Sequence, residues 1–307
     1  MGKVYSWSAI TEQGIPSPRD FENARQQALS KLSQLVEYGL IYGARIFGSV
    51  ARGNPSIRSD LDLLVVFEND IAREELRKIF HDVYKETRVI VESTALKREL
   101  VDLGFHTIDP TFLEHFQYIL KEGNIVGNDP LNLVRPQEGN VLNLHQQYLS
   151  QKLKRLTDGL LTPTKEEQLK ILQRALEAPV NVGRRMLMTL RCLGILDLDE
   201  DDDSKEVIIR NYRRIFDEDN GLLQFNFLLE SDRRYTRFLE ETLQGQYIEE
   251  EYEEYLNSTE RECLPQAISW VQGVSLKFHQ SLEGNMKYGK ENRIINSTTL
   301  GKERDFA

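Results

Sequence analysis

The sequence predicts a small mixed-sheet α/β (α+β) domain over residues 1–134, followed by an all-helical bundle over residues 135–283. In the first part, helical stripes of apolar residues alternate with short β-branched runs, whereas the second part has helical periodicity alone. The 307 residues suffice for two hydrophobic cores, because domains most often contain about 100 to 150 residues. Residues 284–307 are polar with little periodicity, and we expect them to form a flexible tail.

The first helix is expected to begin at Ser17-Pro18. Ser17 is a favoured N-cap residue, proline is favoured at the first helical position, and Asp20 would lie near the positive end of the helix dipole. Apolar residues then recur at helical spacing until Gly39. This stripe consists of Phe21, Ala24, Ala28, Leu32 and Leu35.

Three short apolar runs predict strands, at residues 44–47, 61–67 and 88–94, and a second helix is expected over residues 70–86. The residues that this helix would bury are Ile71, Leu76, Ile79, Phe80 and Val83. The order helix, strand, strand, helix, strand predicts a mixed sheet with helices on one face.

A Gly-Ser turn and two carboxylates lie close together in the sequence, at the junction of the first two strands. Gly48 and Ser49 follow the first strand, and a turn without a bulky side chain lets backbone N–H groups approach phosphates closely. Asp60 and Asp62 flank the start of the next strand, where alternate side chains point the same way. Mg²⁺ prefers one or two carboxylates plus substrate phosphates, so this pattern indicates phosphoryl or nucleotidyl transfer.

The pattern resembles the signature of the DNA polymerase β-type nucleotidyltransferase superfamily, in its minimal and antibiotic-modifying branches. The resemblance covers about residues 18 to 130, and beyond them it is only architectural. Its specificity comes from the coincidence of several elements at this spacing between two strands. These are Gly48-Ser49, Ala51-Arg52-Gly53 and Ser59-Asp60-x-Asp62-Leu63.

The resemblance implies the role of each candidate residue. Asp60 and Asp62 would hold two Mg²⁺ ions, and a third carboxylate from a later strand would bind metal and act as the general base. Glu92 is the acid inside the predicted strand, although Asp is commoner there in the family, and a solvent-facing strand acid is the alternative. The nucleotide would be bound by Gly48, Ser49, Arg52 and Ser59, although Arg52 could instead form a stabilising salt bridge.

The expected reaction is the transfer of a nucleoside monophosphate, AMP from ATP, to an acceptor hydroxyl. Two acceptors remain open: a small aminoglycoside-like molecule, which Glu92 and the helical second domain favour, and a protein side chain, which the compact motif favours. The alternative from another class is a catalytically inactive nucleotide-binding or scaffold module of the same fold. Both aspartates of the motif are present, which argues against loss of catalysis.

Several helices are expected after the catalytic domain. A helix should begin at Asp109-Pro110, and further helical stripes run over residues 141–156, 221–244 and 248–282. Thr164 and Glu167 make a capping box for another helix, which Pro179 should kink or end. A bundle of about four or five helices is the simplest way to bury these stripes, and it could select the acceptor.

Composition limits the possible partners and compartments. The net charge of −10 and an acidic balance in both halves argue against extended nucleic acid as a partner. The acidic runs 199–203 and 249–254 could attract a cationic acceptor or could simply be solvated. Two cysteines, no apolar stretch of about 20 residues and no secretory segment predict a cytoplasmic protein without membrane contact.

Overall fold

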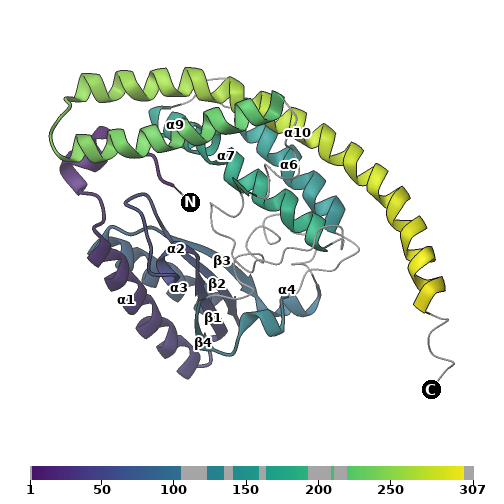
Figure 1. Cartoon of the computed structure of the whole chain (residues 1–307). Coiled ribbons are helices and arrows are strands. Elements are labelled where there is room, and N and C mark those ends of the chain that lie inside the picture. Colours follow the sequence, from purple (N-terminus) through teal and green to yellow (C-terminus); the bar gives the residue numbers. More distant parts are fainter. Residues whose placement is uncertain are drawn as a thin grey trace.

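The computed structural model describes residues 2–104, 123–134, 141–158, 164–192, 209–210 and 220–300. A four-stranded sheet with its helices forms one part, and a group of long helices lies beside it (Figure 1). The elements of the first part are α1 (Pro18–Glu37), β1 (Ile41–Phe47), α2 (Gly48–Ala51), β2 (Leu61–Phe67), α3 (Asp70–Thr87), β3 (Val91–Lys97), α4 (Arg98–Asp102) and β4 (Asn124–Gly127). Those of the helical part are α6 (Val141–Thr157), α7 (Lys165–Cys192), α9 (Asn220–Leu243) and α10 (Glu249–Leu300).

The sheet is mixed, as predicted, with the strand order β3-β2-β1-β4. β1 is antiparallel to both β2 and β4, whereas β2 and β3 are parallel. Alternate residues of β2 point to opposite faces, and Leu61, Leu63 and Val65 pack against α1 and α3 in one hydrophobic core. Leu64 and Val66 belong to a smaller core on the other face. Asp62 has the same parity as Leu64, so it faces away from α1 and α3.

The two predicted helices of this part are confirmed. At the start of α1, the backbone N–H and hydroxyl of Ser17 both donate to Asp20 Oδ2, at 2.8 and 2.6 Å. The predicted stripe of α1 is buried from Phe21 to Leu35. In α3, the burial predicted for Ile71 is wrong, because its side chain is 67% exposed and Ala72 takes the inward position.

The strand that carries Glu92 lies three residues later than predicted. The sequence places it at residues 88–94, whereas β3 runs from Val91 to Lys97. The difference arises because Arg88 ends α3 in the left-handed conformation, with φ of 62°. The chain therefore turns over Arg88 before it can extend, and Glu92 still lies inside the strand.

The helical part follows the predicted stripes and has its own hydrophobic core. Thr164 and Glu167 form the expected capping box, with the Thr164 N–H 3.0 Å from Glu167 Oε2. The prediction that Pro179 could end its helix is wrong, because α7 continues through it among the buried residues Ala178 and Val182. The helix expected after Asp109 lies outside the described residues.

The last helix, α10, extends beyond its predicted end and continues to Leu300, into the segment predicted as a flexible tail. The boundary near residue 135 between the two parts stays a prediction. Within the described part of the chain, no helix combines the length and the apolar character required to cross a membrane.

The N-terminal segment and Arg58 join the sheet to the helical part. The backbone of Tyr5 is held by two tyrosine hydroxyls, those of Tyr235 in α9 and Tyr252 in α10, each at 3.0 Å. Arg58, which is 3% exposed, donates to Asp232 Oδ1 of α9 at 2.7 Å and to the Lys3 carbonyl at 2.8 Å. The buried guanidinium of Arg58, in the loop between α2 and β2, therefore contacts both the N-terminal segment and α9.

We expect Arg58→Met to lower the free energy of unfolding by about 3 to 5 kcal/mol, because it leaves the Asp232 carboxylate buried without its cation. Urea denaturation would measure the change. Arg25→Met removes a more exposed i,i+3 pair with Glu22 and should cost less than about 1 kcal/mol. Equal costs for the two substitutions would contradict this view of Arg58.

Candidate active site

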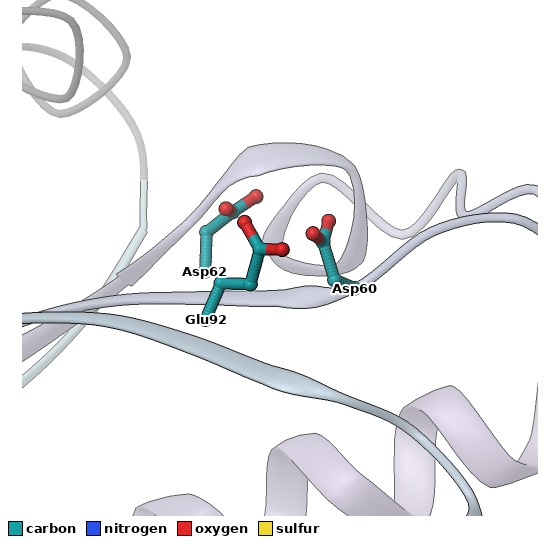
Figure 2. Close-up of side chains that lie close together, drawn as sticks. All are labelled: Asp60, Asp62 and Glu92. Carbon is teal, nitrogen blue, oxygen red and sulfur yellow. The ribbon is translucent and has the colours of Figure 1, made fainter. Parts of the chain in front are cut away.

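Three carboxylates meet at the edge of the sheet face that lies away from α1 and α3. Asp60 directly precedes β2, Asp62 is the second residue of β2, and the parallel pairing of β2 with β3 places Glu92 opposite Asp62. One oxygen from each of the three side chains lies within 4.8 Å of the others. Figure 2 shows the three carboxylates converging. The structure therefore brings together the three acids that the sequence singles out.

The Gly-Ser bend lies directly beside this cluster. Phe47, the last residue of β1, pairs with Asp62, and Gly48 follows it with φ of 78°. A Cβ atom at Gly48 would come within 2.2 Å of Asp62 Oδ2. Glycine is thus required both by the backbone conformation and by the close approach of the Asp62 carboxylate.

The other candidate nucleotide-binding residues also lie at this bend. The Ser49 hydroxyl donates to Ser59 Oγ at 3.0 Å, and Ser59 Oγ accepts the Ser56 N–H at 2.9 Å. Ser59 is 7% exposed, so its main contribution is to hold the loop and orient Ser49. Arg52 is half-buried and follows α2 as its C-terminal cap residue.

The three acids lie close together, and this shifts their pKa values. Burial and the negative charge of Asp60 raise the pKa of Asp62 well above its usual range. The same two causes raise the pKa of Glu92. Burial would also raise the pKa of Asp60, but neighbouring positive charge, Lys3 included, outweighs it and lowers this pKa. Concentrated negative charge of this kind is stabilised by cations.

Lys3 is a cation at this cluster that the sequence analysis does not anticipate. Its ammonium lies 2.5 Å from Glu92 Oε1 and 3.7 Å from Asp60 Oδ2. Burial lowers its pKa, but Glu92 and Asp60 raise it further, so the pKa stays above its ordinary value and the side chain is charged. The Lys3 backbone is fixed to Arg58 by hydrogen bonds of 2.9 and 2.8 Å.

We expect Lys3→Ala to bind Mg²⁺ about tenfold more tightly than the parent chain. A divalent cation at the three acids competes with the ammonium for Glu92, and a charge-assisted hydrogen bond contributes about 1.5 kcal/mol or more. Isothermal titration with Mg²⁺ would measure the change, with the exposed Lys78→Ala as the control. Unchanged or weaker Mg²⁺ binding by Lys3→Ala would contradict this competition.

Glu177 of α7 is a second residue that the sequence analysis misses. It is 8% exposed, and burial raises its pKa to about 7. It lines the same cavity as Glu92, and its charge acts on Lys3 and Arg58. An acid within the apolar stripe around Leu176 and Ala178 is a sequence signal that could have indicated it.

The donor set fits a hard divalent cation. Three carboxylates offer oxygen ligands within 4.8 Å of one another, and the glycine beside them lets the backbone of the bend approach the Asp62 carboxylate closely. A pair of such ions would support an in-line displacement at phosphorus, in which an attacking hydroxyl oxygen replaces a leaving phosphate oxygen. Asp60, Asp62 and Glu92 would be the residues that hold them.

Comparison with known proteins identifies a domain of the chain. Residues 25–119, about a third of the chain, match the nucleotidyltransferase domain family. They include β1, β2 and β3 and all three acids. No curated protein matches the chain.

Solved structures that are similar to this chain include the following two. One is spectinomycin adenyltransferase from Enterococcus faecialis, crystallised with ATP and spectinomycin, at 14% identity over 81% of this chain and 98% of that chain, with a TM-score of 0.44. The other is a nucleotidyltransferase structure from Sulfolobus solfataricus, at 24% identity over 27% of this chain and 79% of that chain, with a TM-score of 0.16. The match over residues 25–119 agrees with the resemblance that the motif gives: this chain contains a segment that matches the nucleotidyltransferase domain family.

Proposed function

We propose that this protein is a Mg²⁺-dependent nucleotidyltransferase that moves AMP from ATP to a hydroxyl group of an acceptor. The observation that carries the proposal is the meeting of Asp60, Asp62 and Glu92 directly beside the Gly48-Ser49 bend. Carboxylates alone are common on surfaces. These three lie beside a bend that requires glycine, and the backbone N–H groups of such a bend would bind the phosphates of a nucleotide.

The proposed step is an in-line displacement at the α-phosphorus. The acceptor oxygen forms a bond to this phosphorus, the bond between the phosphorus and the bridging oxygen breaks, and pyrophosphate leaves. Glu92 takes the proton of the acceptor hydroxyl, which is consistent with its raised pKa. Mg²⁺, when bound, neutralises charge on the attacking and leaving oxygens.

The bend would hold the other end of the nucleotide. Ser49 and the backbone N–H groups of the bend would contact the β- and γ-phosphates, with Ser59 orienting the Ser49 hydroxyl through their 3.0 Å hydrogen bond. Arg52 would reach the same phosphates from the end of α2. Ser59 thus acts as a positioning residue.

The acceptor is proposed to be a small molecule or a protein side chain that bears a hydroxyl. Of the two acidic runs considered for a cationic acceptor, 199–203 lies outside the described residues. Glu249–Glu254 begins α10, and none of its residues lines the cavity beside Glu92. Attraction of a cation by these runs is therefore not part of the proposal.

Incubation of the purified chain with each labelled NTP, Mg²⁺ and a cell extract would test the proposal. We expect label from ATP to move to an acceptor fraction with wild type and not with Asp62→Asn. A chain that binds Mg-ATP but transfers no label to the small-molecule, protein or RNA fraction would be a nucleotide-binding or scaffold module. Failure to bind Mg-ATP would exclude both functions.

A further inference from the structure

A cavity of about 530 Å³ opens beside Glu92, between β3 and the helices α6 and α7. The N-terminal segment, from Lys3 to Pro16, forms another wall. Cavities of about 300 to 1,000 Å³ are the usual size for small-molecule sites. The space is therefore large enough for a small acceptor and too small for a folded protein partner.

The position of the cavity identifies it as the acceptor side of the proposed reaction. β1, β2 and β3 lie side by side, so the Gly48-Ser49 bend after β1 and the cavity at β3 are on opposite sides of Asp62. Neither Gly48 nor Ser49 lines the cavity. In an in-line displacement, the attacking group and the leaving phosphates are also on opposite sides of the reacting phosphorus. This step rests on the proposed function.

Two ion pairs at the cavity cancel their own charges. Lys3 is paired with Glu92 at 2.5 Å, and Lys170 is paired with Glu166 at 2.6 Å. Neither pair contributes a net charge to the cavity. The remaining charged side chains of the lining decide which acceptor the cavity attracts.

Four further cations line the cavity, against one further acid. The cations are Arg88, Lys152, Arg155 and Arg174, and the acid is Glu177. None of the four forms an ion pair with an acid of the described chain. Glu177 is only partly ionised at neutral pH, because burial raises its pKa to about 7. The cavity therefore carries a surplus of positive charge.

The positive charges of Arg155 and Arg174 act on each other. Burial and the positive charge of Arg155 lower the pKa of Arg174, and the negative charge of Glu177 offsets this only in part. Arg88 has a left-handed backbone, with φ of 62°, at a position where glycine or asparagine is the usual cap. A side chain at this backbone conformation costs free energy, and a role of the Arg88 side chain in the cavity lining would explain why glycine does not replace it.

We propose that this cavity binds a small acceptor that bears a phosphate group in addition to its reacting hydroxyl. The guanidinium groups of Arg155 and Arg174 suit phosphate oxygens in shape and charge, and Lys152 lies on the same wall. Glu92 borders the cavity and would receive the hydroxyl proton. A polycationic aminoglycoside would be repelled by the surplus of positive charge in this cavity.

Isothermal titration of the full chain would test this assignment. The chain is first saturated with Mg²⁺ and an ATP analogue that has a methylene group between the α- and β-phosphorus, which fills the nucleotide site without reaction. Inorganic phosphate and spectinomycin, a cation, are then titrated separately. We expect phosphate to bind wild type and to bind Arg155→Ala/Arg174→Ala at least about tenfold more weakly, while spectinomycin binds neither.

Control measurements separate this proposal from the proposed function. Arg73→Ala/Arg77→Ala removes two cations from α3, which do not line this cavity, and should leave phosphate binding unchanged. Failure of wild type to bind the ATP analogue would count against the proposed function. With the analogue bound, the phosphate-acceptor assignment would be overturned by absent phosphate binding, by equal binding to the cavity variant, or by tighter binding of spectinomycin. If Arg155→Ala/Arg174→Ala no longer bound the ATP analogue, these arginines would be assigned to nucleotide binding instead.

Discussion

The Asp62→Asn variant is expected to lose at least about a thousandfold in kcat while it folds as stably as the parent chain. Asparagine keeps the shape of Asp62 but removes a negative charge from the metal-binding acids, and a loss of about 4 kcal/mol of transition-state stabilisation corresponds to about a thousandfold in rate. The raised pKa of Asp62 means that its ionised form is unfavourable in the folded state, so a neutral residue should not destabilise the fold.

Label transfer from ATP and urea denaturation, measured on the same preparations, would check both parts of this expectation. Asp82→Asn is a matched control, because Asp82 lies on α3 and pairs with Lys31 at the surface. The control should keep wild-type activity. An Asp62→Asn chain with more than about a tenth of wild-type kcat would show that this carboxylate does not hold a catalytic ion.

For Glu92→Gln, we expect kcat to fall by about 10²- to 10⁴-fold with little change in the KM for ATP. Removal of a general base has an effect of this size, and Glu92 lies on the side of the cluster away from the nucleotide-binding bend. The base must be ionised to accept a proton. Wild-type activity should therefore increase with pH as this carboxylate loses its proton.

A pH profile of kcat would separate catalysis from a structural role. Glu92→Gln should lose the rise that depends on this group, whereas Glu86→Gln, at the exposed end of α3, should keep both the rate and the profile. An unchanged pH profile in Glu92→Gln would assign the proton to another group.

Local signals in the sequence were sufficient to predict the elements that carry the site. The cap residues Ser17 and Asp20 and the stripe of α1 determine that helix, because each depends on neighbours a few residues away. The shared direction of Asp60 and Asp62 was also predictable, since they are two residues apart at the start of a strand, whereas Glu92 was singled out through the family resemblance and its pairing with Asp62 is seen only in the structure. Glycine is needed at position 48 for a second reason, the close approach of the Asp62 carboxylate, and this contact is seen only in the structure.

The residues that sequence reasoning missed depend on contacts between distant parts of the chain. Lys3 meets Glu92 across 89 residues, and no local pattern marks that pairing. Glu177 borders the cavity because α7 forms one wall of it and β3 another. Ile71 and Pro179 were misjudged for a related reason: tertiary packing decides which side of α3 is inward and allows α7 to continue through a proline.

Counting the bound divalent ions would test the central claim most directly. Mn²⁺, which has an electron paramagnetic resonance signal when free, would be titrated into the chain in the presence of the methylene ATP analogue. We expect wild type to bind two Mn²⁺ ions per chain together with the analogue, and Asp60→Asn/Asp62→Asn to lose them. A wild-type chain that binds no Mn²⁺ beyond what the analogue binds alone would contradict the account.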